Sequence, residues 1–286
     1  APPAVADKPR PPPYSLPFQL RPVVAVNVVR ADAATAFYSA PGVSASGTTS
    51  VSTLLFSYKV TDELAPLVRL GIVSNSPPAG DSGLGFMNPV VGAIYSLKLA
   101  PALRLGLFLG VTVPVGSGGG NAPSPEMGPT RTAGIYARSA MDNAMFAVND
   151  VTIFPGVGLA YIAHGFTAQV EATVLQLLRV RGDEAQPDAS KTNFTAGLHL
   201  GYFIVPMLSI GAELRHQRWL STPVAVQRDA SRATRDTTTV AFGPRGHFKL
   251  GETMWLRPAV AFAMGLDDPM MASEHKILQV DIPFAF

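Results

Sequence analysis

The chain closes with the stretch ILQVDIPFAF (277–286), in which apolar residues occupy every second position. One set of alternate positions is entirely apolar and consists of Leu278, Val280, Ile282, Phe284 and Phe286. The other set includes Gln279 and Asp281. Successive side chains of a β-strand point to opposite faces, so this period of two predicts a strand with one apolar face.

The same period continues towards the N-terminus through the whole chain. We expect twelve such strands, near residues 18–31, 48–60, 66–75, 88–98, 102–114, 149–163, 165–181, 191–204, 207–219, 236–250, 253–266 and 275–286. Short turns alternate strictly with long loops, of which 115–148 is the longest. This alternation is typical of an up-and-down barrel with one rim of tight turns. The sequence therefore predicts an all-β, transmembrane, antiparallel barrel of about 12 strands, with short periplasmic turns and long extracellular loops.

The composition agrees with a membrane barrel and excludes other classes. Only 15% of the residues are charged and 47% are hydrophobic, whereas a soluble domain has about 25% charged residues. No stretch of about 20 residues is continuously apolar, which argues against membrane-spanning helices. With 26 Gly and 26 Pro a coiled coil is excluded, and the absence of Cys excludes disulfides and thiolate chemistry. A net charge of +2 without a basic run gives no sign of a nucleic-acid partner.

Charge placement favours a membrane barrel over a soluble sandwich. When the more apolar parity of each strand is placed outside, we expect an outer face free of Asp, Glu, Lys and Arg, and an inner face rich in Gly, Thr, Gln and Arg. Aromatic residues on the outward parity fall close to the short turns, as a girdle at the membrane interface would. They are Tyr58, Tyr95, Tyr161, Tyr202, Phe18, Phe166, Phe248 and Phe286.

The inward parity carries a surplus of basic residues. The candidate lumen and selectivity residues are Arg21, Lys59, Arg69, Lys98, Arg104, Glu171, Arg179, His199, Glu213, Arg215, Arg245, Lys249 and Arg257. Such a surplus either favours anions or braces the wall through ion pairs, and the sequence leaves both interpretations open.

One pair of these residues can be placed by register. If Val205–Met207 forms a three-residue turn, His199 faces Glu213, and Gly197 faces Arg215. His199 would then gain and lose a proton near physiological pH and gate the charge of the lumen. The alternative is that Arg215 binds Glu213 and leaves His199 neutral.

Many glycines on the inward parity leave space in a barrel of this width. Water or another part of the chain must fill that space. The best candidate is the loop 115–148, as a plug or constriction, with an extracellular cap as the alternative. Residues 1–17 are rich in Pro and are expected to form an extended periplasmic arm, with the barrel spanning residues 18–286.

No residue pattern points to catalysis, a metal site or a cofactor. The polar residues Asp267, Asp268, Glu274 and His275 are best interpreted as a solvated loop. His216 and Ser221 are five residues apart across a strand end, which is a weak basis for a nucleophile and its base. We therefore do not expect an enzyme.

The C-terminal strand resembles the signal by which the barrel-assembly machinery recognises bacterial outer-membrane proteins. The residues that carry the resemblance are Leu278, Val280, Ile282, Phe284 and Phe286. A second stretch, GLGFMNPVVGAIYSLKLAPALRLGLFLGVTVPVGSG (83–118), is similar to a family of outer-membrane barrels encoded beside aromatic (phenol) degradation pathways. These resemblances imply a Gram-negative outer membrane, contact with its lipid, a signal peptide already removed, and uptake of small apolar or aromatic compounds.

The expected function is an outer-membrane channel that passes small solutes by passive diffusion, either anion-favouring or suited to small aromatic and apolar compounds. The alternative is a non-conducting barrel that anchors a partner protein through the N-terminal arm or the outer loops.

Overall fold

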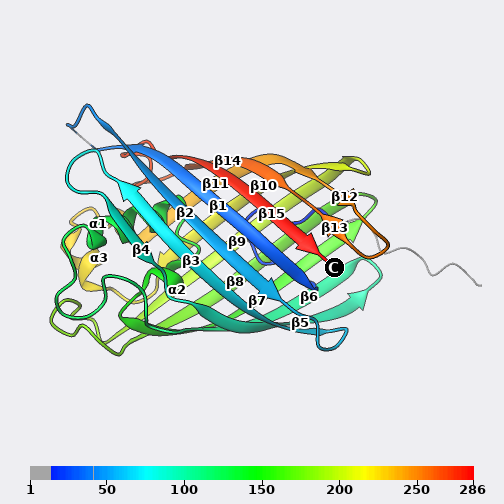
Figure 1. The fold of residues 1–286 in the computed structure, drawn as a ribbon, viewed down its shortest axis with the longest axis horizontal. Coiled ribbons are helices and arrows are strands. Elements are labelled where there is room, and N and C mark those ends of the chain that lie inside the picture. Colours follow the sequence, from blue (N-terminus) through cyan, green and yellow to red (C-terminus); the bar gives the residue numbers. More distant parts are fainter. Residues whose placement is uncertain (1–13, 41) are drawn as a thin grey trace, which may run out of the picture.

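The computed structural model describes residues 14–40 and 42–286, which form a closed antiparallel barrel of twelve strands (Figure 1). The strand segments are β1 (Val28–Ser39), β2 (Ser46–Ser57), β3 (Leu64–Ser76), β4 (Gly83–Phe86), β5 (Val90–Ala100), β6 (Leu103–Thr112), β7 (Asp150–Ala163), β8 (Phe166–Arg179), β9 (Ser190–Val205), β10 (Leu208–Trp219), β11 (Asp236–Gly246), β12 (Phe248–Lys249), β13 (Trp255–Leu256), β14 (Ala259–Gly265) and β15 (Lys276–Ala285). Each strand pairs with its neighbour in the chain, and β1 also pairs with β15, which closes the barrel.

Three of the twelve strands are interrupted. β4 and β5 both pair with β3, and β13 and β14 both pair with β15, so each couple is two parts of one strand. β12 follows β11 after His247 and pairs with β13. The predicted barrel, its antiparallel order and the short–long alternation of its connections are confirmed.

The long loops gather at one end of the barrel and contain its helices (Figure 1). These are α1 (Met127–Ala137), α2 (Asn143–Phe146), α3 (Val224–Arg228) and the 3₁₀ turn η1 (Ala233–Arg235). No helix among the described residues is both long and apolar enough to cross a membrane. The tight turns and the C-terminus lie at the opposite end, as an even strand number requires.

The first strand is where the prediction is wrong. A strand was expected near 18–31, but β1 begins at Val28, and the residues before it lie inside the barrel. Pro22 has no N–H to donate to a sheet ladder, which disfavours a strand there. Strand β1 was harder to recognise because its outward residues include the small Ala31 and Ala33, while its inward residues include charges.

The outer face of the wall is apolar as predicted. Leu107, Val170, Leu214 and Val260 are among many apolar residues that are 37–70% exposed on it. Within the described strands, three outward-facing residues are charged, and all lie at the loop end: Arg218, Asp236 and Lys276. The expectation that the outer face is wholly free of charge is therefore wrong at this end. Arg218 and Asp236 lie 3.6 Å apart, so most of this charge is paired.

The aromatic girdle is present with one exception. Tyr58, Tyr95, Tyr161 and Tyr202 are 42–52% exposed near the tight turns. Phe18 was expected on the same ring but is only 5% exposed, because it lies in the lumen. In the last strand, the outward alternation is also confirmed, and four of its residues are 37–46% exposed: Leu278, Val280, Ile282 and Phe286. Recognition of this strand by the assembly machinery stays a prediction.

Candidate functional site

Residues Tyr14–Asn27 run through the lumen without forming a strand or helix; we call them the inner segment. Inward glycines of the wall provide its space. A Cβ atom on Gly197 would lie 2.4 Å from Leu20, and one on Gly201 would lie 2.3 Å from Ser15. Contacts this short require the side chains of the segment to shift. Some of the inward glycines therefore make room for the N-terminal residues.

The charged residues of the wall hold the backbone of the inner segment. Glu213 accepts hydrogen bonds from the N–H groups of residues 18 and 19, and Glu171 accepts one from the N–H of Arg21 at 2.7 Å. Arg245 donates to the carbonyl oxygens of residues 16 and 17 at 3.1 and 2.9 Å. His199 Nε2 lies 3.0 Å from the carbonyl oxygen of Ser15. Residues predicted to set solute selectivity thus bind the protein's own chain.

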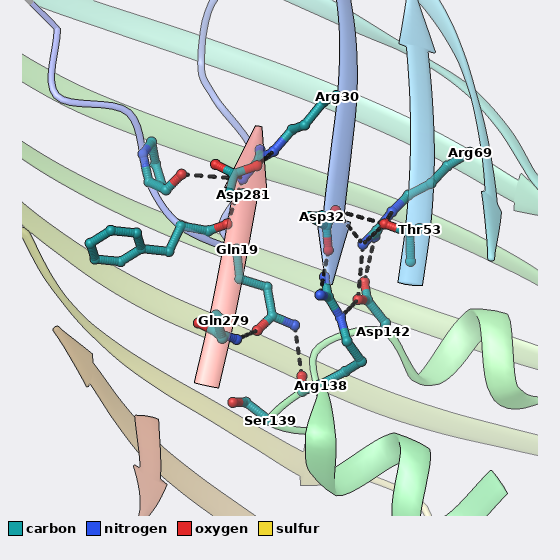
Figure 2. A network of polar contacts seen from close by, with 12 residues as sticks. Gln19, Arg30, Asp32, Thr53, Arg69, Arg138, Ser139, Asp142, Gln279 and Asp281 are labelled. Carbon is teal, nitrogen blue, oxygen red and sulfur yellow. Dashed lines mark hydrogen bonds and ion pairs between the residues drawn. The ribbon is translucent and has the colours of Figure 1, made fainter. Parts of the chain in front are cut away.

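The loop 115–148 enters the lumen from the other end and is held by an ion-pair network (Figure 2). Arg138 pairs with Asp32 of β1 and, at 2.7 Å, with Asp142. Arg69 of β3 lies 2.6 Å from Asp142 and 3.6 Å from Asp32. The two Asp and two Arg side chains neutralise one another's charge. Buried charges need such partners, because an unpaired charge in the interior is strongly destabilising. Apolar packing adds to this attachment, since Met145 is 1% exposed.

The inner segment and the loop meet near the middle of the barrel. Gln19 Nε2 donates to the carbonyl oxygen of Arg138 at 2.7 Å (Figure 2). Arg215 donates to Ser139 Oγ at 3.2 Å and to Gln279 Oε1 at 2.9 Å. Two separate parts of the chain therefore meet inside the lumen, and a role of the loop as a plug or constriction stays a prediction.

The thirteen predicted lumen residues lie in three places. Seven lie together inside the barrel, and they are Arg21, Arg69, Glu171, His199, Glu213, Arg215 and Arg245. Five lie at the rims: Lys98 and Lys249 are exposed, Lys59 is partly exposed and pairs with Asp62, Arg104 binds carbonyl groups of its own turn, and Arg179 binds those of residues 186 and 187. The last, Arg257, lines a cavity at the tight-turn end.

The predicted register around His199 is confirmed, but the expected three-residue turn is wrong: Val205 pairs with Leu208, and a bulge between Leu208 and Ser209 brings the strands into this register. His199 faces Glu213 and Gly197 faces Arg215 across β9 and β10. Arg215 makes the closer contact with Glu213, at 2.6 Å, whereas Nδ1 of His199 lies 3.5 Å from Oε1 of the carboxylate. The alternative that Arg215 binds Glu213 is thus part of the structure, and gating of lumen charge by His199 stays a prediction.

Most inward charges are paired, which favours bracing of the wall. Arg21 lies 2.7 Å from Glu171, and Asp281 binds both Arg30 and Arg245 at 2.6 Å. Four members of these networks were not predicted from the sequence: Arg30, Asp32, Arg138 and Asp142. The first two fall where β1 was misplaced, and the other two lie in a loop whose contacts no periodicity reveals.

Three cavities follow one another along the lumen. The outer one, of about 470 Å³, lies among the long loops. A central one of about 70 Å³ lies below α2, and a third of about 150 Å³ lies at the tight-turn end. The central and third cavities share four lining residues: Arg21, Leu55, Leu67 and Phe108. Closure therefore occurs at two levels, at α2 and at these shared side chains.

The structure also brings together a Ser and a His that sequence reasoning missed. Ser273 Oγ lies 2.8 Å from Nδ1 of His275, and it donates to the carbonyl oxygen of Pro269 at 2.7 Å. Because the Ser273 hydroxyl donates its hydrogen bond to this carbonyl oxygen and not to His275, the imidazole does not activate Ser273 as a nucleophile. Within residues 14–40 and 42–286, no group of three or more His, Cys, Asp or Glu side chains could hold a metal ion.

Comparisons of sequence and of structure give different results. No protein-family model matches the sequence, and no curated protein sequence matches it. A search of solved structures finds similarity to the COG4313 outer membrane channel from Pseudomonas putida F1, with a TM-score of 0.54 over 94% of this chain and 98% of that one, at 15% identity. The fold is that of a bacterial outer-membrane barrel. Lower scores relate it to the NanC porin (TM-score 0.49, 9% identity, 90% and 98% covered) and the KdgM porin (0.48, 8%, 90% and 99%).

Proposed function

We propose that this barrel is an outer-membrane channel for small solutes, and that small apolar or aromatic compounds suit it best. The observation that carries the proposal is the series of three cavities along the lumen, which together lead from the long loops to the tight-turn end. The fold shared with an outer membrane channel supports the same function.

The lining of the narrow part favours apolar solutes over ions. Leu55, Leu67, Phe108, Phe154 and Leu175 surround the central cavity. The charges beside them are paired, as in Arg21 with Glu171 and in Arg69 with Asp142. Paired charges exert little net field on a passing ion, whereas an apolar wall offers an apolar solute a surface at little desolvation cost.

A second candidate is a barrel that does not conduct and instead anchors a partner. The observation in its favour is the size of the central cavity, because about 70 Å³ is far below the roughly 150 Å³ that holds benzene. Passage therefore requires the inner segment or α2 to move. The Pro-rich arm proposed to contact a partner falls mostly on residues 1–13, outside the described residues.

The two candidates are separated by solute entry into liposomes that contain the purified protein. Leu175→Trp fills the central cavity, whereas Val174→Trp on the same strand changes only the lipid-facing side, where Val174 is 40% exposed. A channel predicts entry of small aromatic solutes that Leu175→Trp abolishes and Val174→Trp preserves. Entry no faster than into protein-free liposomes would favour the anchoring role, and equal entry with both variants would remove the central cavity from the route.

A further inference from the structure

The outer cavity, which we call the outer vestibule, is built from parts of the chain that are far apart in sequence. Helices α1 and α2 form one side, and the loop ends of β8, β9 and β10 form the other. α3 and residues 185–188 complete the rim. A volume of about 470 Å³ exceeds the roughly 150 Å³ that holds benzene, so a substituted single-ring molecule fits.

One part of the vestibule is apolar and aromatic. Six lining residues share this character: Ile135, Tyr136, Phe146, Leu177, Trp219 and Val226. Phe146, Leu177 and Val226 are at most 4% exposed, so this wall is packed and preformed. Burial raises the pKa of the Tyr136 phenol to about 12, and this hydroxyl is therefore a neutral polar group at the cavity edge. Rigid aromatic surfaces of this kind bind planar rings.

The remaining polar lining is not fully paired. Lys191 lies 3.0 Å from Asp150, and Asp188 accepts a hydrogen bond from the N–H of Val224 at 3.1 Å. In contrast, Arg131 and Arg228 make no ion pair with any carboxylate in residues 14–40 and 42–286; Arg131 donates instead to the carbonyl oxygen of residue 118. The vestibule therefore holds three cations and two carboxylates, which leaves one net positive charge.

One feature indicates that an anion would complete this polar lining. Arg131 is partly buried beside the cavity, no carboxylate among the described residues pairs with it, and burial together with the nearby Arg181 lowers the pKa of its guanidinium. An anion would compensate Arg131, because a guanidinium binds a carboxylate strongly.

We propose that the outer vestibule binds small aromatic carboxylates, with the ring against the aromatic wall and the carboxylate on Arg131. This inference rests on the proposed function, because the vestibule is the outer end of the solute route. It also accounts for both substrate preferences expected from the sequence, since the anionic selection occurs at the entrance and the apolar selection occurs below it.

The chain contains only two Trp residues, which makes the site directly observable. Trp219 lines the vestibule, whereas Trp255 belongs to β13 at the opposite end of the barrel. In a Trp255→Phe protein, refolded in detergent, Trp219 is the sole reporter. The probes are 4-nitrobenzoate and the neutral 4-nitrobenzyl alcohol, which have the same ring and the same quenching group.

Saturable quenching of Trp219 by 4-nitrobenzoate is expected, with an affinity about tenfold above that of the alcohol, as one charge-assisted contact provides. Arg131→Gln should lower the affinity for 4-nitrobenzoate about tenfold and leave the affinity for the alcohol unchanged. Arg131→Lys should keep most of the affinity for 4-nitrobenzoate. The Trp219→Phe protein, in which only Trp255 reports, measures quenching outside the vestibule.

Equal affinity for acid and alcohol, or an acid affinity that Arg131→Gln leaves intact, would overturn the assignment of a carboxylate site. Quenching that rises linearly and equally in both single-Trp proteins would overturn the vestibule as a binding site. Neither outcome depends on transport. Saturable binding of the acid without any solute entry into liposomes would contradict the proposed function and leave the vestibule site standing.

Discussion

The two parts of the chain that cross the lumen are attached in opposite ways. The inner segment has no regular structure, and wall side chains such as Glu213 and Arg245 bind its backbone. The loop 115–148 carries two helices and contributes its own charged side chains, Arg138 and Asp142, to the network with the wall. Side chains of the segment add to these backbone contacts, as in the ion pair of Arg21 with Glu171 at 2.7 Å, whereas the loop is attached through a buried network of four charged side chains. We therefore expect the inner segment to be released more readily than the loop.

Loss of Arg138 should have the largest effect on stability. Arg138→Met leaves Asp32 and Asp142 to share Arg69, and removal of one partner from a buried ion network costs about 3–5 kcal/mol. Urea unfolding in detergent measures this loss. The matched control is Lys59→Met, whose partner Asp62 lies on an exposed turn, and its unfolding should be unchanged. A loss that is equally small in both variants would contradict the account of the loop.

Glu213→Gln should loosen the inner segment more than the loop. The change weakens the acceptor for the N–H groups of residues 18 and 19 and breaks the ion pair with Arg215, at a cost of about 3 kcal/mol. Hydrogen exchange should accelerate at these two amides and stay slow in α1. The exposed Glu63→Gln is the control. Equal acceleration in both regions would show that the segment and the loop form one unit.

Substitutions of glycine in the two parts should have smaller effects of opposite sign. A Cβ at Gly197 would clash with Leu20, and Gly197→Ala should destabilise by about 1–2 kcal/mol. Gly128 lies in α1 with no atom within 4 Å of the added carbon, so Gly128→Ala should stabilise by up to about 1 kcal/mol. Thermal unfolding of the two variants measures both shifts. Shifts of the same sign would refute the tight fit of the inner segment.

The smallest expected effect is a response of the loop to acid. His275 contacts Tyr136 of α1, and burial lowers the pKa of its imidazole from 6.5 to about 4. As the pH falls, His275 takes up a proton in the unfolded chain at a higher pH than in the folded protein. The contribution of His275 to the free energy of unfolding is therefore complete above about pH 6.5 and is lost as the pH falls to about 4. His275→Phe should flatten the stability profile in this interval relative to the native protein. An identical slope in both proteins would exclude His275 as the origin.

The wall could be predicted because one physical rule governs all of it. A lipid-facing side chain must be apolar, so alternation with a period of two appears in nearly every strand, from β2 to β15. The register of His199 opposite Glu213 also agreed with the prediction, although it results from a two-residue turn followed by a bulge and not from the three-residue turn that was assumed.

The contents of the lumen could not be predicted in the same way. Phe18 and Leu20 alternate with Gln19 and Arg21 as they would in a strand, and no local signal distinguishes a strand from an extended segment inside the barrel. The inward glycines did indicate that something fills the space. Which part of the chain fills it depends on contacts such as Arg138 with Asp32, which are 106 residues apart and follow no period.

A reversible lock on the inner segment would show whether solutes have to pass it. Ser15 Oγ of the segment and Ser209 Oγ of β10 lie 3.3 Å apart, both residues are at most 1% exposed, and the chain has no Cys of its own. A Ser15→Cys, Ser209→Cys protein should form a disulfide when oxidised, because the two positions are close enough to bridge. We predict that aromatic solute entry into liposomes falls to background when the protein is oxidised and recovers when it is reduced. Equal entry in both states, with the disulfide confirmed by mass spectrometry, would contradict the prediction that solutes pass the inner segment.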